Sequence, residues 1–197
     1  MSIIDVSGQK TLDGDYQFNR QELVSAFRFS NNGTFEFFFS YGASDRIAKG
    51  TYKIEGDSVK LFSEKTPGND FSVDKQRKKG TGYTIHCNAP DKQHYLFIQC
   101  IAITNGATEV YDAQSDGTIQ IEATHCDRLY LTHSIFPDIP TLIKDENNEN
   151  NEFTVTLLPS IQGISFKGIT LKLEEDGTLT CLPNYLMMME NIRFRKQ

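Results

Sequence analysis

Apolar and polar residues alternate along much of the chain. Phe27 and Phe29 alternate with polar or small neighbours, and residues 34–37 repeat the pattern. A period of two is typical of a strand that buries one face. The turn sequence Asn31-Asn32-Gly33 lies between these runs, and Asn-Gly is a strong hairpin signal because both residues tolerate positive φ. The pattern predicts a β-hairpin over residues 23–40.

Similar turn sequences recur further along the chain. Gly56-Asp57, Asp116-Gly117 and Asp176-Gly177 each lie beside short alternating runs. Short strands at regular spacing, with turn residues between them, favour a barrel or a sandwich. The predicted fold is all-β, an antiparallel meander barrel or sandwich with little helix. Further strands are expected at 81–87, 95–102, 107–112, 128–133, 152–158 and 191–195.

The length of 197 residues suits one large β domain or two small ones. We expect residues 1–197 to form a single β assembly, with sub-regions at 1–66 and 67–197. The acidic segment 145–152 is an alternative boundary, and a long hairpin loop explains it equally well. A basic segment, 74–79, is also expected to be a solvated loop tip between strands.

The net charge and the apolar runs bear on which classes of partner the chain can bind and on where it is located. Twenty Lys and Arg against 26 Asp and Glu give a net charge of −6. This balance argues against a nucleic-acid partner, which needs clustered positive charge. No apolar run approaches the roughly 20 residues of a membrane helix, so no membrane span is expected. The start of the chain lacks the features of a signal peptide, which predicts a cytoplasmic protein unless a leader was trimmed.

The four cysteines are widely spaced and none forms a CxxC pair. Their surroundings resemble strands, and free cysteine is among the most buried residue types. We therefore expect reduced, buried thiols rather than disulfides. These residues are Cys87, Cys100, Cys126 and Cys181.

Gly14-Asp15-Tyr16, residues 27–35 and residues 50–61 together resemble parts of lipocalin-like domains. Gly14-Asp15-Tyr16 is similar to the Gly-x-Trp of their first strand, with Tyr16 in place of Trp. Residues 27–35 are similar to their second and third strands, and residues 50–61 to a later hairpin of the bacterial members. The resemblance covers residues 12–62. It implies a meander barrel or a strongly curved sheet, and a small apolar ligand, and it transfers no catalytic residue.

Five residues are candidate ligand contacts. Phe38 and Tyr41 are chosen because one face of their strand already carries the aromatic residues expected in the core. Asp45 and Arg46, in an expected connection between strands, form an acid–base pair that suits a polar ligand; a loop-bracing ion pair is the simpler alternative. Tyr52 of the later hairpin completes the set. Packing within the protein is the alternative for the aromatic members.

Neither a metal site nor a cofactor is expected. His86-Cys87 and His125-Cys126 suggest mixed ligands, but neighbours on a strand point to opposite faces and do not share one ion. A site from His125 and His133 would need a bend. The chain also lacks the G-x-S-x-G nucleophile elbow, and local spacing identifies no catalytic pair.

Three functions follow from these features. The first is a non-enzymatic binding protein that holds a small apolar or amphipathic ligand among the strand aromatics. The second is a protein–protein interaction module, favoured by the long polar loops. The third is an enzyme whose site is scattered across strands, which would need a cleft with titratable groups of perturbed pKa.

Overall fold

The structure is a computed structural model that describes residues 11–197, and it confirms the all-β class. Contacts divide the chain into two compact units. Of the described residues, the first contains 11–65 together with Gly163–Gln197, and the second is Thr66–Gln162. The described residues include two short 3₁₀ helices, η1 (Lys92–Phe97) and η2 (Pro159–Gln162). Within 11–197 we find no helix with the length and apolar character needed to span a membrane.

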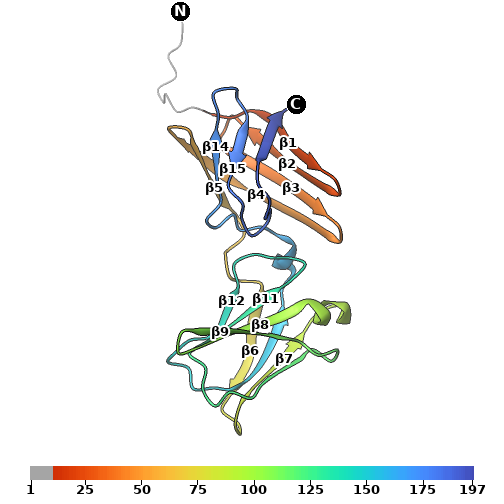
Figure 1. The fold of residues 1–197 in the computed structure, drawn as a ribbon, viewed down its shortest axis with the longest axis vertical. Helices are drawn as coiled ribbons and strands as arrows, with labels where there is room; N and C mark the ends of the chain where they lie inside the picture. The colour runs from red at the N-terminus through yellow and green to blue at the C-terminus, as the bar shows by residue number, and fades with distance from the viewer. Residues whose placement is uncertain (1–10) are drawn as a thin grey trace, which may run out of the picture. The chain divides into compact units, whose positions relative to one another are not determined.

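The first unit is a closed, antiparallel barrel of eight strands (Figure 1). Around the barrel the strands follow the order β1-β16-β15-β14-β5-β4-β3-β2. Five consecutive strands therefore form a meander, and three strands from the C-terminal part complete the ring. The strands are β1 (Gly14–Arg20), β2 (Leu23–Ser30), β3 (Thr34–Tyr41), β4 (Ser44–Glu55), β5 (Ser58–Ser63), β14 (Thr170–Leu173), β15 (Leu179–Cys181) and β16 (Ile192–Lys196).

The hairpin expected over residues 23–40 is confirmed as β2 and β3, with Ser30 opposite Thr34. Its loop contains the three residues Asn31, Asn32 and Gly33. Only Gly33 takes a positive φ, +86°, and its N–H donates to the carbonyl of Ser30 at 3.0 Å. Asn32 contributes its side chain instead, because its Oδ1 accepts the N–H of Thr34 at 3.1 Å. A three-residue loop with a left-handed glycine is a common hairpin solution.

The C-terminal strands close the barrel at both ends of the meander. β16 pairs with β1, and β14 pairs with β5. The segment 163–197 thus shares one sheet with the sub-region expected at 1–66, although the whole second unit lies between them in sequence. Closure removes the free edges that an open five-stranded meander would expose.

Aromatic rings fill the interior of the barrel. The burial of β3 alternates, so that Phe35, Phe37 and Phe39 point inward, as the sequence pattern predicts. Phe27 is 1% exposed and lies at the centre of the ring cluster. Its ring centroid is 4.4 Å from that of Phe37 and 5.1 Å from that of Phe194. Such contacts within the barrel support the packed-core alternative for the inward aromatics.

The second unit contains two four-stranded sheets, ordered β10-β7-β13-β6 and β12-β11-β8-β9. All pairs are antiparallel except β13 with β7, which is a departure from the antiparallel expectation. A strand that returns after a long excursion can enter a sheet in either direction. The strands are β6 (Phe71–Arg77), β7 (Tyr83–Asn88), β8 (Ile98–Thr104), β9 (Ala107–Asp112), β10 (Thr118–Ile121), β11 (Arg128–His133), β12 (Thr141–Lys144) and β13 (Glu152–Leu157).

Cysteine burial leads to a testable prediction. All four thiols are free, and Cys87 and Cys100 lie in the core of the second unit. Burial raises the pKa of Cys87 to about 12, and burial together with the neighbouring thiols raises the pKa of Cys100. A raised pKa leaves little reactive thiolate at pH 8. In the folded chain, we expect a disulfide reagent to label these two cysteines orders of magnitude more slowly than in urea. Rapid labelling of either, mapped by peptide mass spectrometry, would contradict the prediction.

Candidate functional site

The outward side chains of β1–β4, called the outer face here, form the candidate site. Strand register aligns them in rows across the sheet. Gln17 pairs with Ala26, Ala26 with Phe38, and Phe38 with Ile47. We call Ala26, Phe38 and Ile47 the apolar row. Phe38 is 43% exposed and Ile47 is 63% exposed, so two large apolar side chains face solvent side by side.

A row of charged residues runs parallel to the apolar row, two residues away along each strand. Its sign alternates from strand to strand, negative at both ends. Asp15 pairs with Arg28, Arg28 with Glu36, and Glu36 with Lys49. Beyond β4, the N–H of Glu64 donates to the carbonyl of Lys49 at 2.9 Å. The charge ladder consists of Asp15, Arg28, Glu36, Lys49 and Glu64.

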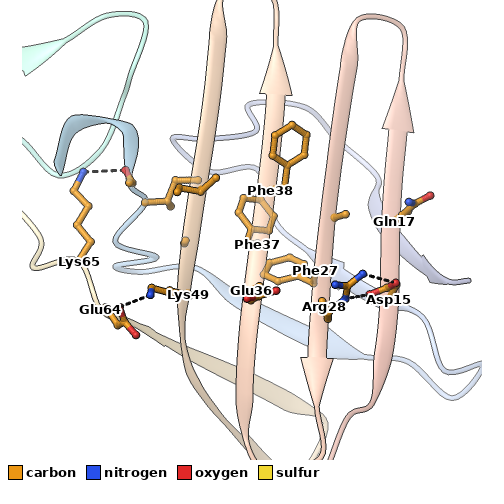
Figure 2. A pocket seen from close by; sticks show the side chains of 15 residues that line it. Asp15, Gln17, Phe27, Arg28, Glu36, Phe37, Phe38, Lys49, Glu64 and Lys65 are labelled. Carbon is orange, nitrogen blue, oxygen red and sulfur yellow. Dashed lines mark hydrogen bonds and ion pairs between the residues drawn. The ribbon is translucent and has the colours of Figure 1, made fainter. Parts of the chain in front are cut away.

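The members of the ladder differ in how firmly they are paired within the chain (Figure 2). Arg28 donates two hydrogen bonds to the Asp15 carboxylate, at 2.8 and 3.2 Å. Lys49 Nζ lies 3.6 Å from Glu64 Oε2, and both side chains are about two-thirds exposed. Within the described residues, Glu36 has neither a hydrogen bond nor an ion pair through its side chain. The ladder therefore retains a carboxylate and an ammonium that can bind a further group.

The ion pair at the end of the ladder keeps both of its members charged. The hydrogen bond from Arg28 lowers the pKa of Asp15, and the same bond raises the pKa of Arg28. Both groups are solvent-exposed, so the pair contributes little to stability. On the outer face, the pair holds one negative and one positive charge at fixed positions.

The two rows line a groove of about 570 Å³. Its floor is the outer face, and Phe38 and Glu36 of β3 both line it (Figure 2). On the far side of β4, Gly163 continues the sheet through a bridge to Ile47. Lys65 lies at this rim, where its Nζ donates to the carbonyl of Gly163 at 3.0 Å. An apolar floor bordered by charges suits an amphipathic surface or molecule.

Comparisons with protein-family models, with curated proteins and with solved structures gave no match. The inferences about this site therefore come from its own geometry.

Of the five candidate contacts, Phe38 alone lines the groove. Tyr41 is 52% exposed at the end of β3 and lies outside it. Tyr52 is buried, and its hydroxyl lies 2.8 Å from the carbonyl oxygen of Leu12 and 3.0 Å from that of Ser30. It joins neighbouring segments of the barrel rather than facing the groove.

Asp45 and Arg46 lie in β4, not in a connection as expected, because the turn before them contains only two residues. Strand neighbours point to opposite faces. Asp45 is exposed and accepts a hydrogen bond from the hydroxyl of Ser40 at 2.6 Å. Arg46 is 0% exposed and donates to the carbonyl of Gly163 at 2.6 Å. The two side chains do not form the expected acid–base pair.

The charged segments of the second unit pair with each other. Lys78 Nζ lies 2.9 Å from Glu149 Oε2, and Lys79 Nζ lies 3.3 Å from Glu152 Oε2. The prediction of two loop tips was wrong for residues 74–77, which belong to β6, and for Glu152, which begins β13. Lys75, Gln76 and Arg77 pair with β13. Arg77 and Glu152 are in register across β6 and β13, so one pair of opposite charges meets at the end of these strands.

Two of the four histidines lie together, but the four do not gather at one position. His125 Nε2 lies 2.9 Å from Asp127 Oδ1, whereas His133 Nε2 lies 3.1 Å from His94 Nδ1. His86 is exposed and Cys87 is buried on β7, which confirms that these neighbours point to opposite faces. Among residues 11–197, no group of three or more metal-ligating side chains is close enough to hold an ion.

Proposed function

We propose that this chain is a binding protein, that the outer face is its contact surface, and that its partner is another protein chain. The observation that supports this is the apolar row, which exposes Phe38 and Ile47 beside an ordered set of charges. Val24, 45% exposed, extends the apolar surface along β2. Large apolar side chains near charges of fixed position are typical of protein contact surfaces.

The apolar row contributes mainly to binding affinity, and the charge ladder mainly to the choice and alignment of the partner. Burying a fully exposed Phe or Ile contributes about 1.5–3 kcal/mol, so covering the exposed parts of Phe38 (43%) and Ile47 (63%) contributes roughly 1–2 kcal/mol each. The exposed charges contribute less to affinity, but they select a partner of complementary pattern and align it. A partner therefore needs an apolar strip and a row of alternating charge at matching spacing.

A photocrosslinking experiment tests this proposal. A benzophenone amino acid at position 38, in the chain expressed in its own host, should give a crosslinked protein adduct. The same substitution at Leu182 is the control, because Leu182 is 82% exposed, directly follows β15 on the opposite side of the barrel from β3, and does not line the groove. We expect several-fold more adduct at position 38. Equal labelling at both positions, or no adduct at position 38, would contradict the proposed contact surface.

A small amphipathic ligand is the second candidate, and the size of the groove favours it. About 570 Å³ is within the range of small-molecule sites, roughly 300–1,000 Å³. Since the inward aromatics pack against one another, this candidate assigns the ligand to the outer face. Native mass spectrometry of the chain purified from its host should then detect a retained small molecule, which Phe38→Glu should release.

The lipocalin-like resemblance remains a proposal about origin. The closed eight-stranded antiparallel barrel supports it, as does Tyr16, which is 4% exposed on the first strand. The crowded interior is a departure, and it removes the usual reason to expect a ligand inside such a barrel.

A further inference from the structure

We propose that the protein bound by the outer face is a second copy of this chain, related by a two-fold axis that runs parallel to the strands between β3 and β4. This inference rests on the proposed function, because it names the partner of the same surface. Self-association through one face requires that face to be complementary to itself under the two-fold rotation. Both rows of the outer face meet this requirement.

The charge ladder is complementary to itself because its sign alternates between neighbouring strands. With the axis between β3 and β4, β3 of one copy lies over β4 of the other copy, and β4 lies over β3. Glu36 then faces the partner subunit's Lys49, and Lys49 faces the partner subunit's Glu36. The next pair outward, Arg28 with the partner subunit's Glu64, again has opposite signs. The barrel surface curves away on both sides of the axis, so this outer pair adds attraction at longer range rather than a direct contact.

The internal pairing of the ladder favours this axis over one between β2 and β3. An axis between β2 and β3 would oppose Glu36 with Arg28, which already donates two hydrogen bonds to Asp15. The chosen axis uses Glu36, which lacks an ion pair within the described chain, and Lys49, whose contact with Glu64 is long at 3.6 Å. The two charges with the weakest pairing inside the chain are therefore the ones that face each other across the dimer.

The apolar row leads to the same axis. A rotation about an axis parallel to the strands maps each row onto itself, so the ladder and the apolar row stay in register. Phe38 then faces the partner subunit's Ile47, and Ile47 faces the partner subunit's Phe38. These are the two large exposed side chains of the row, and each is covered by the other. An axis between β2 and β3 would instead oppose Phe38 with the small Ala26.

Charge reversal in the full-length chain tests the inference by sedimentation velocity over about 1 µM to 1 mM. We expect the wild-type chain to dimerise. Glu36→Lys opposes two lysines, Lys49→Glu opposes two glutamates, and each contact occurs twice in the dimer. Each variant alone should dimerise roughly 100-fold more weakly. An equimolar mixture of the two variants should form a heterodimer of near wild-type affinity, because both contacts are then between opposite charges.

The controls separate the dimer from loss of folding and from the broader binding function. Val110→Glu adds a charge at a 56% exposed residue of the second unit and should leave dimerisation unchanged. Recovery in the mixture is possible only if both variants fold. A wild-type chain that stays monomeric to 1 mM, or a mixture that does not recover, overturns the inference. If the chain is monomeric yet position 38 crosslinks a different protein, the proposed function stands and self-association is wrong. If it is monomeric and position 38 gives no adduct, both are wrong.

Discussion

Replacing Phe27 by alanine should lower the free energy of unfolding of the first unit by about 3–5 kcal/mol. The side chain is 1% exposed, and its ring lies within 6.1 Å, centroid to centroid, of five other phenylalanine rings. Deletion leaves a cavity that rings fixed on separate strands cannot readily fill. Urea unfolding measured by circular dichroism, with hydrogen exchange to assign the change to residues of the barrel, tests this prediction.

Phe38→Ala is the matched control, because it removes the same ring from the other face of the barrel. Phe38 is 43% exposed, so its loss should cost about 1 kcal/mol or less. Equal destabilisation by the two substitutions would show that the assignment of inward and outward faces is wrong.

Gly50→Ala should destabilise the barrel by about 3 kcal/mol or more. A Cβ atom at Gly50 would lie 2.0 Å from the carbonyl oxygen of Phe62 and 2.8 Å from the Cα atom of Ser63. Both contacts are with backbone, so no side-chain rotation relieves them, and β4 and β5 would have to separate. Glycine in a strand interior often marks such a close approach of two backbones. Chemical denaturation should show a lower midpoint with little change in slope.

Gly56→Ala is the control for this substitution. Gly56 has a φ of +67°, and a Cβ atom there would have no neighbour within 4 Å. Only the left-handed backbone conformation opposes alanine at this position, at a cost of about 1–2 kcal/mol. A larger effect at Gly56 than at Gly50 would contradict the steric argument.

Local patterns correctly predicted several strands and the hairpins at Asn32-Gly33, Gly56-Asp57 and Asp176-Gly177. The turn at Asp116-Gly117 was wrongly expected to join paired strands, because β10 after it pairs with β7, and β9 before it belongs to the other sheet. The expected strands at 107–112 and 128–133 coincide with β9 and β11. The expected strand at 95–102 begins too early, because residues up to Phe97 form η1. Asp91 begins this helix through a hydrogen bond from the N–H of Gln93 to its carboxylate, at 2.9 Å, a signal that alternation does not record.

Part of the outer face could have been predicted from the sequence by extending the register of the first hairpin along its two strands. Once Ser30 is opposite Thr34, Arg28 must face Glu36, and Ala26 must face Phe38. The sequence pattern singled out Phe38 as an outward side chain but left its polar neighbours aside. Ile47 and Lys49 required the next hairpin register, set by the two-residue turn between β3 and β4. Arg46 was misplaced because that turn was taken to be longer.

Closure of the barrel was beyond the reach of local patterns. The pairing of β14 with β5 joins segments on opposite sides of the second unit, and no short-range turn signals it. The acidic segment 145–152, considered as a boundary, lies inside the second unit and pairs with basic residues there. Charge composition marked that segment as unusual, but not which part of the chain would neutralise it.

The second unit interrupts the barrel at a single place on its circumference. Lys65 and Gly163, where the chain departs and returns, are joined by a 3.0 Å hydrogen bond. Inside the second unit, the N–H of Leu158 donates to the carbonyl of Asp70 at 2.8 Å, so its own two ends also meet. Folding units whose ends are adjacent are readily inserted into a host or removed from it. An inserted unit of this kind could be gained or lost in evolution while every strand pairing of the barrel stayed in place.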